Sequence, residues 1–177
     1  EAIDKSLEGT YAIIELFEKL DIKATWFTTA AIGLSDTKIF KRLVDSGQEI
    51  ALHALHDRDD YNKMTEVKAR KRLEKAKNIV EMMSGQKTVG FRAPRFQRPS
   101  LKIIKDLGFK YDSSLHPSPM PGRYSGKGKL VPHVDEESGL TVLPVSVVPG
   151  LRLPLSWIWF RMLPKGYMKW GASLVEA

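Results

Sequence analysis

Residues 47–56 read Gly-Gln-Glu-Ile-Ala-Leu-His-Ala-Leu-His, and this stretch decides how the rest of the chain is interpreted. Gly47 ends a predicted helix, the run from Glu49 to Leu52 predicts a short buried strand, and His53 and His56 follow that strand. Because neutral imidazole is a common zinc ligand, two imidazoles just beyond a strand end form a candidate metal site. An isolated pair of this kind is more often two ordinary loop histidines.

The same order of helix and strand recurs on both sides of this stretch. Predicted helices span residues 7–20, 36–46, 65–84 and 100–107, and predicted strands span 24–28, 88–91 and 109–113. Such alternation predicts parallel strands joined by helical crossovers, either as an open doubly wound sheet or as a (β/α) barrel. After Ser114 a loop runs to about residue 138, and a β-prone segment follows at 140–148. The tryptophan-rich stretch after it carries no clear topology.

Polar side chains follow three of the predicted strands, at the end where parallel (β/α) sheets carry their functional sites. Arg92 follows strand 88–91, and Asp112 lies near the end of strand 109–113, as the histidines follow theirs. Arg95 stands close to Arg92 and offers a guanidinium that can bind a substrate anion, with an exposed ion pair as the alternative. We therefore expect these groups to share one rim of the fold.

The chain contains no cysteine, so any metal must be held by His, Asp or Glu. Asp57 comes directly after His56 and is a further candidate. Its carboxylate either ligates the metal or holds an imidazole N–H, and a solvated loop residue is the alternative.

Length and charge limit the classes of protein that fit. A chain of 177 residues predicts a single domain, and a formal charge of +7 favours anionic partners. The predicted helix 65–84 is strongly basic but accompanies no nucleic-acid-binding motif, so we expect a solvated face and no specific nucleic acid partner. We expect no transmembrane segment, and the first residues do not read as a signal peptide, which leaves a cytoplasmic location as the default expectation.

Four segments, taken together and in order, resemble the NodB-homology polysaccharide deacetylases of carbohydrate esterase family four. Residues 22–27 (Ile-Lys-Ala-Thr-Trp-Phe) are similar to that family's "ATFF" strand, residues 47–53 to "GHEIGNH", residues 90–94 (Gly-Phe-Arg-Ala-Pro) to "FRxP", and residues 108–114 (Gly-Phe-Lys-Tyr-Asp-Ser-Ser) to "GF.YDSS". The resemblance covers residues 7–117, and the order of the four segments makes it far more specific than any one of them.

The resemblance implies a distorted (β/α) barrel and a hydrolase that removes acetyl groups from N-acetylated sugars of a glycan. It also implies a divalent ion, usually zinc, held by one aspartate and two histidines. His53 corresponds to the first histidine, and the family places the second four residues later, where this chain has Asp57. Either His56 ligates from a loop shortened by one residue, as we favour, or Asp57 takes the position. Arg92 would orient the catalytic aspartate, and we assign Asp112 and Arg95 to substrate binding.

Two parts of the family pattern are not found in these residues. An aspartate-rich "TFDD" motif, source of the base and the third ligand, would lie before Glu1, and no histidine follows His133 to act as the final acid. His133 itself falls in an irregular loop and fits that role poorly. We therefore expect residues 1–177 to be a fragment of one domain whose open edges favour a homo-oligomer. A non-catalytic sugar- or metal-binding relative is the alternative.

Overall fold

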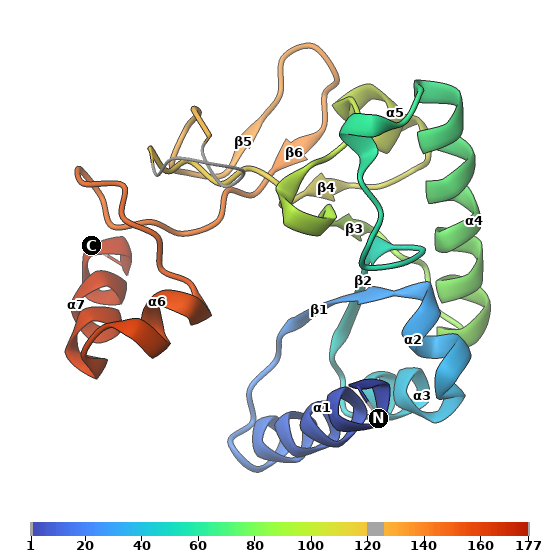
Figure 1. The fold of residues 1–177 in the computed structure, drawn as a ribbon, viewed down its shortest axis with the longest axis horizontal. Helices are drawn as coiled ribbons and strands as arrows, with labels where there is room; N and C mark the ends of the chain where they lie inside the picture. The colour runs from blue at the N-terminus through green and yellow to red at the C-terminus, as the bar shows by residue number, and fades with distance from the viewer. Residues whose placement is uncertain (1, 120–125, 177) are drawn as a thin grey trace.

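In the computed structural model, which describes residues 2–119 and 126–176, the alternating helices and strands build a six-stranded sheet. Its strands are β1 (Thr25–Thr29), β2 (Glu49–Ala54), β3 (Gly90–Phe91), β4 (Tyr111–Asp112), β5 (His133–Val134) and β6 (Thr141–Val142). Their order is β1-β2-β3-β4-β6-β5, and every neighbouring pair is parallel except β5 and β6. The fold is therefore of the (β/α) barrel type, with the barrel left open: Figure 1 shows β1 at one edge.

The described residues contain seven α-helices, of which the first five cover one face of this sheet. They are α1 (Ala2–Lys19), α2 (Ala30–Ser35), α3 (Thr37–Asp45), α4 (Glu66–Ser84), α5 (Leu101–Asp106), α6 (Trp157–Met162) and α7 (Lys165–Glu176). The core lies between α1–α5 and the sheet, where Leu52 and Phe91 pack with Phe40, Leu73 and Ile104, all fully buried. Figure 1 shows α4 on this side and the pair α6 and α7 on the opposite side.

Local signals in the sequence set where the longer helices begin and end. The Asp36 side chain accepts a hydrogen bond from the Lys38 backbone N–H at the start of α3. Thr65 accepts one from Lys68 at the start of α4, which ends at Gly85 with a left-handed φ of 70°. Such caps satisfy backbone groups that have no partner within the helix, so the predicted ends of both helices are confirmed.

Several elements differ from the expectation. A short helix, α2, follows β1 without a break, and β5 lies inside the predicted loop 114–138. The strands predicted at 88–91 and 140–148 shrink to two residues each, because strand boundaries depend on the partner strand rather than on local composition. The helical period of residues 65–84 predicts Val67 on the core face together with Leu73 and Val80, but Val67 is 65% exposed because it lies on the outer face of α4, whereas Ala69 is buried.

The face of the sheet away from the core carries polar side chains. Glu49 accepts hydrogen bonds from Tyr111 Oη (2.8 Å) and Thr25 Oγ1 (2.5 Å), and these contacts join β1, β2 and β4. Tyr111 crosses β3 at Gly90, where an added Cβ would lie 2.2 Å from its Cζ and Oη atoms. Any side chain at position 90 would collide with the Tyr111 ring, so the network requires glycine there.

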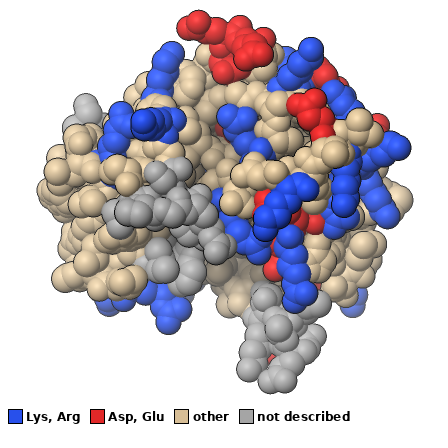
Figure 2. Space-filling view, turned by 45° about the horizontal axis from the view of Figure 1, so that its top comes forward, with Lys and Arg blue, Asp and Glu red and all other residues tan. Residues whose placement is uncertain are grey.

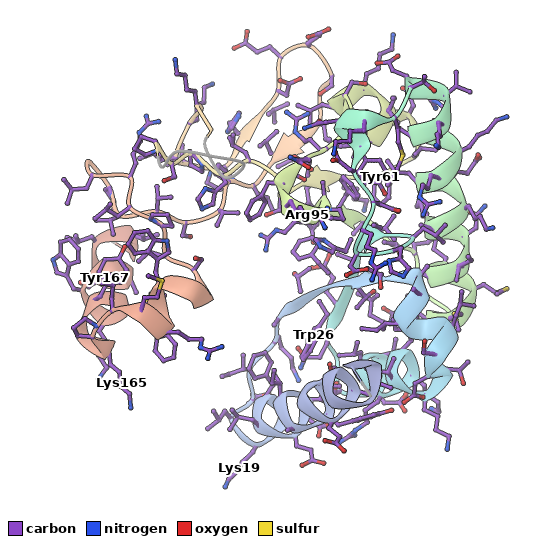
Figure 3. The ribbon with its side chains drawn as sticks, viewed as in Figure 1. Lys19, Trp26, Tyr61, Arg95, Lys165 and Tyr167 are labelled. Carbon is purple, nitrogen blue, oxygen red and sulfur yellow. The ribbon has the colours of Figure 1, made fainter. Side chains whose placement is uncertain are left out.

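The C-terminal helices form a small pair of their own. Tyr167 lies between Trp159 and Trp170, with ring centroids 6.4 and 6.1 Å away, and its hydroxyl donates to the Pro154 carbonyl. Figure 3 labels Tyr167 on the side of this pair that is remote from α4. None of the helices in the described ranges combines the length and the apolar character needed to cross a membrane.

Candidate functional site

Side chains from four neighbouring strands meet at the carboxyl end of the sheet. His53 is the extra residue of a β-bulge in β2, because Thr28 pairs with Leu52 and Thr29 with Ala54. Bulges re-aim side chains next to functional sites, and here the bulge places His53 at the end of β2 beside the backbone of Arg92. The sequence predicted the strand end but not the bulge, which depends on the pairing with β1.

Arg92 spans this rim. Its Nε donates to the Ser113 carbonyl (2.9 Å) and its Nη2 to Ser113 Oγ (2.6 Å), while the guanidinium lies 4.3 Å from the centre of the Phe27 ring. Burial lowers the pKa of Arg92, with the charge of Asp112 acting in the opposite direction. The guanidinium is thus held by the Phe27 ring of β1 and by Ser113, which follows β4. These hydrogen bonds use two of its three nitrogens, and Nη1 remains for a carboxylate.

The His53 ring is partly buried and held by one backbone contact. Its Nδ1 lies 2.6 Å from the Arg92 carbonyl oxygen, a geometry in which Nδ1–H donates and the lone pair stays on Nε2. Burial lowers the pKa of His53 as the leading effect, so the ring favours the neutral form that binds metal. A backbone carbonyl that fixes the tautomer in this way is typical of metal-binding histidines.

His56 is held by the acid that follows it. Its Nδ1 lies 2.5 Å from Asp57 Oδ1, and both side chains are more than half exposed. The Arg58 backbone N–H also approaches the same nitrogen (3.4 Å), so the contacts within this loop engage Nδ1 and not Nε2. Which of the two predicted alternatives, His56 or Asp57, is the second ligand stays a prediction.

A buried ion pair fixes the loop that carries His56. Asp59, with 3% of its side chain exposed, accepts hydrogen bonds from Arg72 Nε (2.7 Å) and from the backbone N–H of His56 (3.2 Å). Arg72 belongs to α4, so this contact ties the loop to the helix layer. The basic composition of residues 65–84 predicts a solvated position for Arg72, and the spacing of the two residues in the sequence does not indicate its pairing with Asp59.

Asp112 does not face an open cavity. Its side chain is fully buried, accepts hydrogen bonds from Ser114 Oγ (2.5 Å) and the Ser114 backbone N–H (3.2 Å), and lies 3.4 Å from Arg98 Nε. Burial raises the pKa of Asp112 as the largest effect. Both carboxylate oxygens of Asp112 are thus occupied by groups of the protein. The side chain is therefore placed to hold the segment after β4 and not to contact a substrate directly.

Arg95 lies in a turn of unusual backbone geometry. Arg95 and Phe96 have φ angles of 54° and 61°, left-handed values that are uncommon outside glycine and that cluster at functional sites. Phe96 stacks on the His116 ring at 5.1 Å. Figure 3 shows Arg95 on the side of the sheet away from α4, where its partly exposed side chain can meet a ligand.

A hollow of about 610 Å³ extends along the free edge of β1 to the rim. Its walls include both faces of β1, with Trp26 and Phe27, and its rim end includes the candidate ligands His53 and His56. In Figure 3, Trp26 lies between β1 and α1. The hollow is large enough for a small ligand and places the two imidazoles at its mouth.

The described residues contain two candidate imidazole ligands for a metal ion. These are His53 and His56, yet nowhere in residues 2–119 and 126–176 do three His, Asp or Glu side chains gather as a metal would require. A tetrahedral zinc site with three protein ligands therefore needs one more ligand than these residues provide.

Comparison with known proteins adds context to this geometry. Residues 4–111 match the family model described as polysaccharide deacetylase. A "peptidoglycan deacetylase-like protein" of Gibberella zeae is 27% identical over 169 residues, covering 90% of this chain and 50% of that protein. The chain thus spans about half the length of this curated relative.

Two solved structures are similar in fold. A Mycobacterium smegmatis protein named for the same family superposes with a TM-score of 0.65 at 24% identity, covering 78% of this chain and 46% of that one. A wild-type pseudoenzyme of carbohydrate esterase family four from Bacillus anthracis superposes with a TM-score of 0.54 at 25% identity, covering 58% and 37%.

Proposed function

Since the chain belongs to the polysaccharide deacetylase family, we propose that it is part of a metal-dependent hydrolase that removes acetyl groups from N-acetylated sugars of a glycan. The observation that carries this proposal is the His53 ring, held neutral at a strand end with its Nε2 free and with Arg92 beside it. The name of the Gibberella zeae relative, which matches 90% of the chain, supports the same chemistry.

His53 and His56 would hold the divalent ion, for which we propose zinc because both ligands are imidazoles. The third ligand and the base that activates water would be carboxylates from outside the described residues. When bound, zinc supplies Lewis acidity that polarises the acetamide carbonyl and lowers the pKa of a water molecule.

The other rim residues act on position and charge. Arg92 presents its Nη1 edge to the catalytic carboxylate and keeps that group ionised and oriented, while Ser113 and Phe27 hold the guanidinium in place. Asp57 fixes the tautomer of His56. Arg95 extends beside the rim and would meet polar groups of the glycan.

Calorimetric titration with zinc tests the ligand assignment. We expect one site in the chain, loss of that site in His53→Ala and His56→Ala, and a fall in affinity of about 10–100-fold in Asp57→Ala, because Asp57 orients a ligand without being one. His133→Ala is a matched control, since that ring lies in β5 and contacts the Val131 carbonyl. Unchanged zinc binding by His53→Ala would contradict the assignment.

A non-catalytic sugar- or metal-binding protein is a second candidate. Two observations favour it: in the described ranges the ligand set is incomplete, and one similar structure is a family pseudoenzyme. Acetate release from N-acetylated chito-oligosaccharides separates the two candidates when measured on a protein that also contains the region preceding residue 1. Turnover that disappears in Arg92→Met identifies an enzyme, whereas zinc binding without acetate release identifies the non-catalytic relative.

A further inference from the structure

The basic residues of α4 fall into two groups. Three are paired with acids: Arg70 with Asp106 (2.6 Å), Arg72 with Asp59 (2.6 Å) and Lys77 with Glu81 (3.7 Å). The remaining three, Lys68, Lys71 and Lys75, are exposed and make no ion pair with any residue in the described ranges. In Figure 2 basic side chains gather on the right-hand side, the side on which Figure 1 places α4. Half of the helix's positive charge is thus left for an external partner.

These three lysines, which we call the lysine face, are spaced i, i+3 and i+7, so they lie on one side of α4 over about 10 Å. They line a shallow hollow of about 420 Å³ together with Leu55 and Thr65. An acidic group entering this hollow would therefore meet several ammonium groups at once. Their summed attraction exceeds the small free energy that any single exposed ion pair contributes.

The hollow lies next to the rim. Leu55 lines the hollow beside the lysine face, whereas His53 and His56 line the hollow along β1. The segment 53–56 thus contributes side chains to both hollows. Arg58, which also lines the hollow along β1, has no ion-pair partner in the described part of the chain. Arg58 thus adds positive charge at the rim, beside the Asp57 carboxylate that contacts His56.

We propose that the lysine face binds carboxylate groups of an acidic glycan whose acetylated residue lies at the His53 rim. The proposal rests on the proposed function and names the class of substrate. Lysine provides compact point charges that suit scattered carboxylates. No aromatic ring lines the hollow to stack on a nucleobase, and Val67 is its one strongly exposed apolar residue, too little to anchor a membrane surface.

Binding of a fluorescently labelled hexagalacturonate tests this inference. The variant Lys68→Gln/Lys71→Gln/Lys75→Gln should bind at least ten times more weakly, and its affinity should depend less on salt, because fewer charges take part. The matched control Lys102→Gln/Lys110→Gln/Lys129→Gln removes the same charge from exposed lysines that line neither hollow, and it should stay within about threefold of the unmodified chain. Gln has nearly the helix propensity of Lys, so both variants should fold.

Three results would overturn the proposal. Equal losses in the two triple variants would show a general effect of net charge. Binding of single-stranded DNA or of anionic phospholipid vesicles that equals hexagalacturonate binding and depends on the same lysines would assign the face to another partner. Unchanged hexagalacturonate binding in the lysine-face variant would show that the lysine face is not the binding site. If a triple variant does not fold, the single variants Lys71→Gln and Lys102→Gln give the same comparison.

Failure of the proposed function gives a different result. His53→Ala should abolish zinc binding and leave hexagalacturonate binding unchanged, whereas the lysine-face variant should keep the zinc site. Loss of the zinc site alone thus concerns the chemistry at the rim, and loss of polyuronate binding alone concerns the lysine face.

Discussion

Substituting Gly90 with alanine tests whether the polar network on the open face of the sheet holds the strands beneath the rim. The new Cβ would lie 2.2 Å from both Cζ and Oη of Tyr111, so the ring would have to retreat by about an ångström. Its hydroxyl would then lose the 2.8 Å hydrogen bond to Glu49. The substitution in β3 therefore affects both neighbouring strands, β2 through Glu49 and β4 through Tyr111.

The expected loss of stability combines two effects. Overpacking a well-packed site costs about 1–3 kcal/mol, and a hydrogen bond to a charged group contributes about 1.5 kcal/mol at a half-buried position. We expect Gly90→Ala to lower the free energy of unfolding by about 3 kcal/mol, and Tyr111→Phe, which removes only the hydroxyl, to lower it by about 1.5 kcal/mol. Near-UV circular dichroism and urea denaturation would measure both.

A double-mutant cycle separates this clash from a general intolerance of alanine in β3. In a Tyr111→Ala background the ring is absent, so Gly90→Ala should cost almost nothing or stabilise by about 0.5 kcal/mol, since alanine loses less backbone entropy than glycine. The expected coupling between the positions is about 2–3 kcal/mol. A cost of Gly90→Ala that is the same in both backgrounds would refute the reasoning.

The remaining predictions concern the loop, the segment after β4 and a helix cap. Arg72→Met leaves the Asp59 carboxylate buried without its cation, so it should lower the free energy of unfolding by about 2–3 kcal/mol and weaken zinc binding, as urea denaturation and calorimetry would show. Asp112→Asn tests a linkage: burial raises the Asp112 pKa above its usual 3.8, so the stability of the unmodified chain relative to the variant should fall as the pH rises above that value, and a rise would contradict the burial effect. Thr65→Ala removes the α4 cap and should cost about 1 kcal/mol in thermal unfolding, with no change in zinc affinity.

Local signals predicted the helices well because each signal acts within a few residues of its partner. Thr65 and Gly85 define the ends of α4 through backbone contacts that need no tertiary structure. Val67 was placed in the core wrongly, since an apolar residue in the first turn satisfies the helical period equally well on either side of the buried stripe.

The candidate site was predicted less completely. The order of the strand ends brought His53 and Arg92 to one rim, as expected from parallel strands. The pairing of Asp59 with Arg72 and the contact of Arg98 with Asp112 were missed, because both join residues at 13 or more positions apart through the path of a loop. No periodicity in the sequence encodes such contacts.

The bulge at His53 also bears on how the chain tolerates insertions and deletions. Side chains alternate between the faces of a strand, so a one-residue change within β2 before His53 would turn the imidazole towards the helices and Leu52 towards the rim. After Ala54 the strand has ended, and a residue can be gained or lost there without reversing any face. The segment from His53 to His56, one residue shorter than in the family pattern, extends across this permissive boundary. Length variation in relatives should therefore concentrate just past Ala54, and the strand itself should keep a constant length.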